Sequence, residues 1–397
     1  MTGSDDIYDV AVIGGGPAGA TAAHDLARRG VRVALVDRAG RIKPCGGAIP
    51  PRLIRDFDIP DHLIVARITS ARMVSPRDRR VDMPIDNGFV GMVDREHFDE
   101  WLRERAAGAG ARRITGSCER LSRDPQGVVT LHLGGRDADE GAALRARIAI
   151  VADGARSAIA REEIPQNGDP RCVFAYHEIV RPPAPGDGDY DRSRCDVYYN
   201  GALSPDFYAW VFPHGETCSI GVGSARKGVS LRGSIRALRA SAGLDRGETL
   251  RREGAPIPLK SLKRWDNGRD LVLAGDAAGI VAPASGEGIY YAMLGGRLAA
   301  DAAFEALRTG DARALAQARK RFMKAHGRIF WILGIMQYFW YGSDRRRERF
   351  VSICGDRDVQ RLTWEAYMNK ELGRPRPLAH ARIFFKDLAH LFGVVSP

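Results

Sequence analysis

The sequence predicts an α/β fold with an inserted antiparallel β-sheet and a helical C-terminal region. Three observations lead to this prediction: a strand, glycine turn and helix near the N-terminus, short strand-like runs between residues 172 and 223, and helical patterns in the last third of the chain. At 397 residues the chain is too long for one ordinary core, so two or three domains are expected.

The N-terminal stretch predicts a Rossmann-type dinucleotide site. A β-branched run at 10–13 precedes a glycine turn and an Ala- and Leu-rich helix at 20–29, and a second strand at 31–36 ends at Asp37. Glycines at this spacing allow a tight turn, close approach of a pyrophosphate and close helix packing, and an acid about 20 residues later can bind ribose hydroxyls. The candidate residues are Gly14, Gly16, Ala18, Gly19 and Asp37. This fingerprint alone fits NAD and FAD equally.

A loop and a helix follow that could contribute to the same site. Pro and Gly predict a loop at 41–48, whose Cys45, Gly46 and Gly47 follow the second strand and could lie against a flavin ring. A buried cysteine without chemistry is the alternative for Cys45. Arg95 begins an amphipathic helix for which Asp94 is a plausible N-cap, and it could meet a phosphate or simply be solvated.

Two further strand ends carry small and acidic residues. A buried-looking strand at 148–152 ends at Asp153 and Gly154, and another at 271–274 ends at Gly275 and Asp276. After a loop, a row of small residues opens a long helix at about 289–307, where the positive helix end suits an anion or a flavin edge. The candidates in this row are Pro283, Gly286, Gly288 and Ile289.

Between these motifs the pattern changes to short strands separated by Pro, Gly and Asp. Runs at 172–180, 195–200, 207–212 and 217–223 predict an antiparallel sheet inserted as a second domain. Alternate side chains of a strand share a face, so Tyr208, Trp210 and Phe212 fall on one side. Without further information, this pattern predicts a strand that packs in the core of its own domain.

Composition limits the class of protein. The net charge of +11 and pI near 9.6 suit an anionic partner or surface, or reflect an Arg-rich genome. No nucleic-acid partner is expected. The six cysteines show no metal-ligand spacing, so no metal site is predicted and a reducing cytosol is favoured. The first strand starts too early for a signal peptide, and no apolar run of about 20 residues occurs, so a cytoplasmic protein is expected.

Together the motifs resemble the FAD-containing, aromatic hydroxylase-like superfamily. The resemblance is carried by GxGxxG at 14–19, a DG motif at Asp153-Gly154 with Arg156, and a GD motif at Gly275-Asp276 with Pro283. It implies FAD as cofactor, with Asp276 on the ribityl chain. Many members have Glu where this chain has Asp37, which shortens the reach to the ribose.

Within that superfamily the chain resembles the geranylgeranyl reductases. Pro44-Cys45-Gly46-Gly47 and Tyr208-Ala-Trp210-Val-Phe212-Pro213, a YxWxFP signature, carry this likeness, and 275–297 and 340–377 look most like the branch that acts on (bacterio)chlorophyll. The resemblance implies NADPH-dependent reduction of isolated double bonds in a geranylgeranyl chain, on the pigment or on the free diphosphate, in bacteriochlorophyll biosynthesis. It also implies a prenyl-binding role for Tyr208, Trp210, Phe212 and Pro213. Cys45, Tyr208 or water is the proton donor.

The expected organisation has three parts. The FAD-binding domain takes 1–70, 91–165 and 265–308, the β-sheet substrate domain 71–90 and 166–264, and a helical C-terminal domain 309–397. The aromatic run at 330–341 and the arginines at 345–349 allow either a core helix over the prenyl chain, which we favour, or an element at the surface of the photosynthetic membrane.

Other classes share parts of these patterns. A flavin hydroxylase (monooxygenase) would share the three FAD motifs, and an archaeal-type lipid geranylgeranyl reductase would share the chemistry. A halogenase would need a catalytic lysine beside its Trp-rich signature, and none stands out here. A non-catalytic prenyl carrier would bind isoprenoid without flavin turnover.

Overall fold

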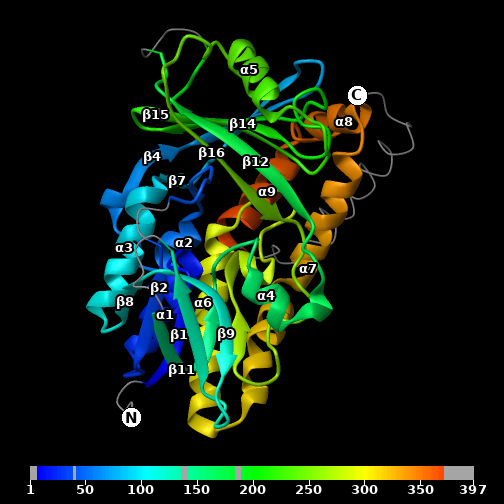
Figure 1. Ribbon diagram of the computed structural model, residues 1–397. Helices are drawn as coiled ribbons and strands as arrows, with labels where there is room; N and C mark the ends of the chain where they lie inside the picture. Colours follow the sequence, from blue (N-terminus) through cyan, green and yellow to red (C-terminus); the bar gives the residue numbers. More distant parts are fainter. Residues whose placement is uncertain (1–6, 39–41, 136–141, 184–188, 371–397) are drawn as a thin grey trace. The chain divides into compact units, whose positions relative to one another are not determined.

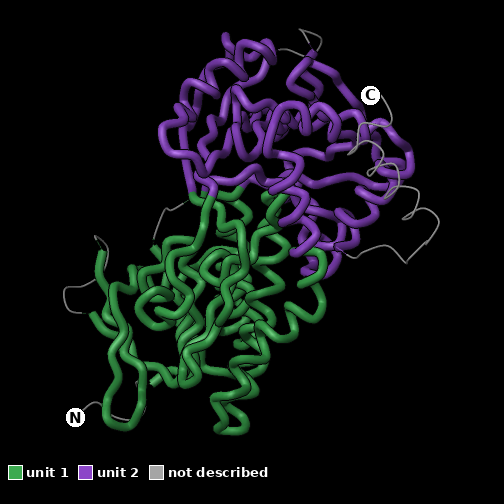
Figure 2. Tube along the Cα trace, turned by 90° about the vertical axis from the view of Figure 1, so that its right-hand side faces the viewer, with its two compact units in different colours: residues 1–43, 95–172, 256–330 green, residues 44–94, 173–255, 331–397 purple. Residues whose placement is uncertain are grey.

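The computed structural model describes residues 7–38, 42–135, 142–183 and 189–370, and the chain runs through them as Figure 1 shows. Two compact units are present (Figure 2). The first comprises residues 1–43, 95–172 and 256–330, and the second 44–94, 173–255 and 331–397. Each unit is therefore assembled from three separate pieces of the chain.

A seven-stranded sheet forms the centre of the first unit, with the path β8-β2-β1-β11-β10-β9 and β17 paired to β11. The pairs β8-β2, β2-β1, β1-β11 and β11-β17 are parallel, while β10 pairs antiparallel with β9 and β11. Strand bounds are β1 Ile7–Ile13, β2 Val33–Asp37, β8 Arg112–Thr115, β9 Ser117–Arg123, β10 Val129–Gly134, β11 Ala143–Val151 and β17 Leu271–Leu273. The central segments of the parallel strands, at 10–13, 33–36, 148–151 and 271–273, are apolar and buried.

Helices α1 (Pro17–Ala27), α3 (Arg95–Gly108) and α6 (Ile289–Thr309) belong to this unit. α1 contacts both α3 and α6. The two helices α1 and α6 approach closely because α6 has a glycine, Gly296, where it meets α1. A Cβ on Gly296 of α6 would lie 2.1 Å from the carbonyl oxygen of Ala18 in α1. The unit also holds α4 (Ala158–Glu163), short 3-10 turns at Pro165–Asn167, Gly275–Ala278 and Ala312–Ala316, and most of α7 (Gln317–Trp340).

The second unit contains another seven-stranded sheet, ordered β16-β12-β15-β14-β13-β5-β6. Neighbours are antiparallel from β12 to β13 and between β5 and β6, whereas β13 and β5 run parallel. Strand bounds are β5 Ser70–Val74, β6 Arg80–Pro84, β12 Cys172–Val180, β13 Arg194–Tyr198, β14 Ala209–His214, β15 Thr217–Ser224 and β16 Thr249–Pro258. Ile235 and Leu238 of α5 (Leu231–Ser241) pack on one face of this sheet.

A smaller sheet, β3-β7-β4, completes the strands of the second unit. Its strands are β3 Ala48–Ile49, β4 Ile64–Ile68 and β7 Val90–Val93, and the remaining elements are α2 Pro51–Asp56, a 3-10 turn at Asp61–Leu63, α8 Asp344–Ile353 and α9 Arg357–Asn369. Phe212 of β14 and Trp364 and Tyr367 of α9 pack around a core that includes Val90 and Met92.

The predicted fold class is confirmed: a Rossmann-like sheet, an inserted, mainly antiparallel sheet and C-terminal helices are all present. The sequence did not predict the three-stranded sheet, because its strands are short and lie far apart in the chain. The predicted domain boundaries stay a prediction. Residues 371–397, part of the expected C-terminal domain and of the 340–377 likeness, lie outside the described residues.

Candidate active site

The glycine turn after β1 forms a cradle at the start of α1. Gly14 has φ +102°, and a Cβ there would lie 2.5 Å from the carbonyl oxygen of Ala152. A Cβ on Gly19 would lie 1.8 Å from the Gly14 carbonyl oxygen, so strand and helix need both glycines. No atom of the described residues lies within 4 Å of a Cβ added to Gly16, which caps α1. The turn therefore leaves free space at the positive helix end, which fits a pyrophosphate.

Asp37 ends β2 beside this turn, and its carboxylate is partly exposed. A Cβ on Gly15 would lie 2.7 Å from its Oδ2, so Gly15 also serves close packing. Arg103 of α3 donates to Asp37 Oδ2 over 3.2 Å and to the Gly15 carbonyl oxygen over 3.3 Å. Sequence reasoning missed Arg103, because one arginine on an amphipathic helix carries no signal. It holds the proposed ribose acid against the glycine turn.

Arg95, at the start of α3, is 5% exposed and is not a solvated side chain, so that alternative is wrong. Its Nε and Nη2 donate to the two carboxylate oxygens of Asp99 over 2.7 and 2.6 Å. Burial of the helix face forces this pairing, because an isolated buried charge is costly. Contact between Arg95 and a phosphate stays a prediction.

The GD motif turns directly onto the start of α1. Gly275 has φ +62°, and a Cβ there would lie 2.7 Å from the Ala18 Cβ. Asp276 is buried, and its Oδ2 lies 2.5 Å from the ammonium of Lys43. A Cβ on Gly288, the N-cap of α6, would be 3.9 Å from Asp276 Oδ1. The structure thus brings together Ala18, Gly275, Asp276 and Gly288 as the sequence predicted.

The loop before α6 is shaped by its own backbone and by Glu287. Gly286 has φ +64° and its N–H donates to the Ala282 carbonyl oxygen over 2.9 Å. Glu287 Oε1 accepts from the N–H of Tyr290, which satisfies an amide in the first turn of α6. Ile289 begins the helix and is buried. Gly286 and Glu287 therefore shape this loop, and contact of Pro283 and Gly286 with a cofactor stays a prediction.

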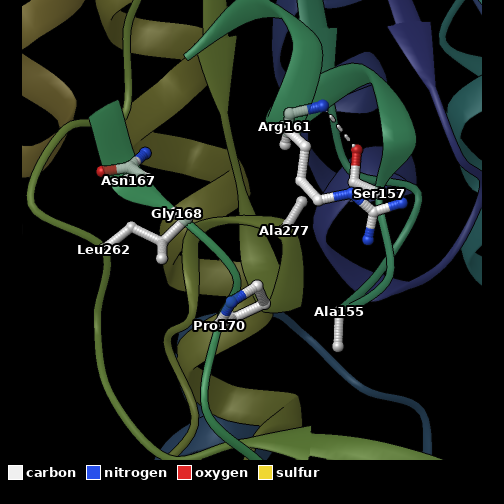
Figure 3. A pocket seen from close by; sticks show the side chains of 9 residues that line it. Ala155, Ser157, Arg161, Asn167, Gly168, Pro170, Leu262 and Ala277 are labelled. Carbon is white, nitrogen blue, oxygen red and sulfur yellow. Dashed lines mark hydrogen bonds between the residues drawn. The ribbon is translucent and has the colours of Figure 1, made fainter. Parts of the chain in front are cut away.

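One pocket links the DG and GD segments (Figure 3). Ala155 and Ser157 of the DG segment and Ala277 of the GD segment line it, and Figure 3 shows the Arg161 side chain at its edge. Ser157 Oγ accepts from the Ala160 N–H and so caps α4. Gly154 has φ +101°, and a Cβ placed there would have no atom within 4 Å in the part of the chain that the structure describes. With the cradle at Gly16, these open positions fit FAD.

In the second unit, the Cys45-Gly46-Gly47 loop lies on strand β14. A Cβ on Gly46 would be 3.1 Å from the Phe212 ring, and one on Gly47 would be 2.5 Å from His214 Nε2 and from the Val93 carbonyl oxygen. Gly47 has φ +72°, and its N–H donates to the sulfur of Cys45 over 3.4 Å. Both glycines are thus required for the loop to approach the strand this closely.

The aromatic residues of the YxWxFP strand form a continuous row. Ring centroids of Tyr208 and Trp210 are 5.9 Å apart, and those of Trp210 and Phe212 are 6.1 Å apart. Tyr208 and Trp210 are buried, and Phe212 is half-buried. Pro213 alternates to the opposite face, so it does not belong to this row. The predicted contact of Pro213 with the substrate stays a prediction.

Sequence reasoning missed the glycines of β15 that make room for these rings. A Cβ on Gly221 would lie 1.9 Å from an atom of the Trp210 ring, and one on Gly223 would lie 2.7 Å from Phe207. The signal was available, since glycine inside a strand often marks close approach of another group.

Burial controls protonation around this row. Burial lowers the pKa of His214 to about 4, although its ring nitrogen Nδ1 bonds to the Phe212 carbonyl oxygen over 3.1 Å. Burial also raises the pKa of Tyr208, with nearby Tyr341 and Cys45 acting in the same direction. Tyr208 therefore keeps its proton at neutral pH, and His214 is neutral there.

The C-terminal helices divide the predicted arginine cluster. Arg347 is 3% exposed and bonds to Asp344 and to the carbonyl oxygens of Pro205 and Tyr341, so it cannot face lipid. Arg345 and Arg346 are exposed. Trp331, Ile335 and Tyr338 of α7 are also exposed, at 68%, 47% and 85%, so α7 is not wholly a core helix. None of the described helices is both long enough and apolar enough to cross a bilayer.

Comparison with known proteins is consistent with this arrangement. Residues 8–179 match the family model described as pyridine nucleotide-disulphide oxidoreductase. The chain is 60% identical over 392 residues to a geranylgeranyl diphosphate reductase of Rhodobacter capsulatus, covering 98% of this chain and 99% of that protein. It is 36% identical to the Synechocystis protein of the same name, covering 97% and 98%.

A solved structure shares the fold. The crystal structure of a geranylgeranyl bacteriochlorophyll reductase-like protein of Thermoplasma acidophilum superposes with a TM-score of 0.81 at 23% identity, covering 92% of this chain and 98% of that one. At this identity the likeness concerns the fold alone. The resemblance inferred from the motifs is confirmed by the full-length relatives, and the chain belongs to the geranylgeranyl diphosphate reductase family of flavin-dependent oxidoreductases.

Proposed function

We propose that this protein is an FAD-containing, NADPH-dependent reductase of the isolated double bonds in a geranylgeranyl chain. The observation that carries the proposal is 60% identity over 98% of the chain to a geranylgeranyl diphosphate reductase. The structure adds support, because the Cys45 loop lies against an aromatic row in which Tyr208, Trp210 and Phe212 offer broad apolar area with few rotatable bonds.

The chemistry requires a hydride and a proton at an alkene that no carbonyl activates. Reduced flavin supplies the hydride when it is bound. The chain must then hold the alkene in a dry site and provide the proton. Cys45 and Tyr208 are the candidate donors, since burial keeps the Tyr208 phenol protonated and the Cys45 thiol is part of the loop on the aromatic strand. We assign the prenyl contact to the aromatic row.

Mass spectrometry under anaerobic conditions tests this function. The holoprotein is incubated with NADPH and, in separate samples, with geranylgeranyl diphosphate and geranylgeranyl bacteriochlorophyll. Successive gains of two hydrogens on one of them identify both the reaction and the preferred head group. No gain on either would overturn the proposal. Oxygen uptake coupled to NADPH oxidation, with an aromatic substrate, would instead indicate a hydroxylase.

We further propose that the exposed face of α7 and α8 contacts an anionic membrane surface, from which a prenylated substrate is taken. The apolar side chains recur at i, i+4 and i+7 as Trp331, Ile335 and Tyr338, which is one side of a helix. Arg345 and Arg346 lie at the start of α8, which follows α7 after a short connection. The guanidinium of Arg346 lies 4.5 Å from the centre of the Phe339 ring. An aromatic face next to basic residues is typical of interfacial helices.

Vesicle binding tests the membrane proposal. Replacing Arg345 and Arg346 by Gln should weaken binding to anionic vesicles by about 1 kcal/mol per charge at low salt. Arg226→Gln with Lys227→Gln is the matched control, because both residues are exposed cations of the same unit on another segment. If both double variants bind anionic vesicles equally well, the α7–α8 face does not contact the membrane and is ordinary solvated surface.

A further inference from the structure

A chain of hydrogen bonds runs beneath the aromatic row of the second unit. Trp210 Nε1 donates to Ser219 Oγ over 3.2 Å, and Ser219 Oγ lies 3.0 Å from His177 Nδ1. His177 Nε2 lies 3.0 Å from Glu253 Oε2. The other carboxylate oxygen of Glu253 pairs with Arg251. The four side chains come from β14, β15, β12 and β16, so the chain spans four strands of the sheet.

The donors and acceptors form one consistent direction. A carboxylate only accepts, so His177 donates from Nε2 to Glu253, and Nδ1 accepts in the tautomer that carries its hydrogen on Nε2. Ser219 then donates its hydroxyl hydrogen to His177 and accepts from the indole of Trp210. Each buried polar group is satisfied by the next one, which specifies a single arrangement.

These residues do not form a nucleophilic Ser-His-Glu site. Ser219 is completely buried, and its hydroxyl is already the acceptor for the Trp210 indole. A nucleophile must be reachable by a substrate. The hydrogen-bonded side chains of Ser219, His177 and Glu253 therefore serve to hold the ring of Trp210.

Sterics and hydrogen bonding together leave the indole little freedom. The ring lies over Gly221, where a Cβ would be only 1.9 Å away, and its N–H is directed to Ser219. Packing against apolar groups gives the indole N–H no preferred partner, and the hydrogen bond to Ser219 supplies one. Ser219 thus fixes an orientation that apolar packing alone does not define.

We propose that Ser219, His177 and Glu253 are positioning residues that hold the Trp210 indole and thereby set how a prenyl chain lies along the aromatic row. This inference rests on the proposed function. A fixed Trp210 ring limits how far the prenyl chain can move along the aromatic row. It therefore sets how many double bonds of the substrate can be reduced before the product is released.

The test uses the FAD-loaded protein and compares Ser219→Ala with Ser224→Ala. Ser224 is the control because it is a buried serine of the same strand that alternates to the opposite face and bonds to Asp206. In protein labelled with 15N on the indoles, the Trp210 N–H resonance is assigned from Trp210→Phe. Ser219→Ala should shift or broaden it, and Ser224→Ala should leave it in place.

Turnover gives a second readout that loss of packing alone would not move. With Ser219→Ala, flavin content and bleaching by NADPH should stay within about twofold of wild type, while KM for the geranylgeranyl substrate rises about tenfold. Partly reduced products, with fewer added hydrogen pairs, should accumulate. Glu253→Gln, which keeps an acceptor for His177, should retain more of the wild-type product pattern than Glu253→Ala.

The two proposals fail in different ways. Wild-type protein that adds no hydrogen to either prenyl substrate would overturn the proposed function. Wild-type turnover, together with a Trp210 resonance and a product pattern in Ser219→Ala that match those of Ser224→Ala, would overturn the positioning role alone.

Discussion

The ammonium of Lys43 lies 2.5 Å from Oδ2 of Asp276, joining the end of the loop after β2 to the turn after β17. Asp276 is the acid that the GD motif assigns to the ribityl chain. Lys43 precedes Cys45 by two residues, so this ion pair anchors the chain just before the Cys45 loop. The ammonium compensates part of the cost of burying the Asp276 carboxylate.

Asp276→Ala should release FAD and leave a folded chain. A hydrogen bond to a charged group is worth about 1.5–3 kcal/mol, so the Kd for FAD should rise roughly 10- to 100-fold. Titration of the apoprotein by flavin fluorescence measures this, with circular dichroism to check folding. Asp301→Ala is the control, since Asp301 pairs with Arg29 at the surface of the same unit. Full retention of flavin by Asp276→Ala would count against the assignment.

Cys45→Ser should keep FAD and slow alkene reduction more than NADPH oxidation by an artificial acceptor. Serine preserves an acceptor for the Gly47 N–H, so the loop should hold its shape while the acidity of the side chain changes. The two rates are measured separately on the same preparation. Equal slowing of both would mean that the loop serves reduction of the flavin.

Trp210→Ala should separate the two half-reactions. We expect kcat/KM for the geranylgeranyl substrate to fall roughly 10- to 100-fold, equivalent to about 1.4–2.7 kcal/mol, while bleaching by NADPH stays near wild type. Because Trp210 is 5% exposed, the variant should also lose about 3–5 kcal/mol of unfolding free energy. Stopped-flow bleaching followed by anaerobic reoxidation resolves the steps. Slowing of the bleaching alone would place the strand in the nucleotide site.

Gly221→Ala should destabilise the second unit by displacing the Trp210 ring. The new methyl group would lie 1.9 Å from a ring atom, and overpacking of this kind costs about 1–3 kcal/mol. Urea unfolding measures the loss. Gly334→Ala is the control, because among residues 7–38, 42–135, 142–183 and 189–370 no atom lies within 4 Å of a Cβ there, and its helical site favours alanine. Equal stability of the two variants would mean that the ring can move at little cost.

His214 should make the protein less stable in mild acid. The pKa of His214 is about 4 in the folded protein, against 6.5 for the free group. Between these two pKa values the unfolded chain binds more protons than the folded protein, so the free energy of unfolding decreases as the pH is lowered. The loss from pH 7 to pH 5 should be about 2 kcal/mol. Urea unfolding of His214→Gln at both values should show a smaller loss than wild type or the exposed-site control His62→Gln. An unchanged loss would contradict the assignment.

The sequence by itself determined the nucleotide-binding half of the molecule. Strand, turn and helix at 7–27 are local structures, and only glycine fits at position 19, where a Cβ would lie 1.8 Å from the Gly14 carbonyl oxygen. Such constraints leave a readable pattern because they depend on neighbours in the chain. The aromatic row was likewise readable from the alternation of a single strand.

Tertiary structure decided the contacts between residues far apart in the chain. The pairing of Lys43 with Asp276 spans 233 residues, and Ser219 meets His177 across 42. It also decided that Arg347 is buried whereas its neighbours Arg345 and Arg346 are exposed. Composition cannot distinguish three consecutive arginines, because burial depends on which carbonyl groups and carboxylates the fold places around each side chain.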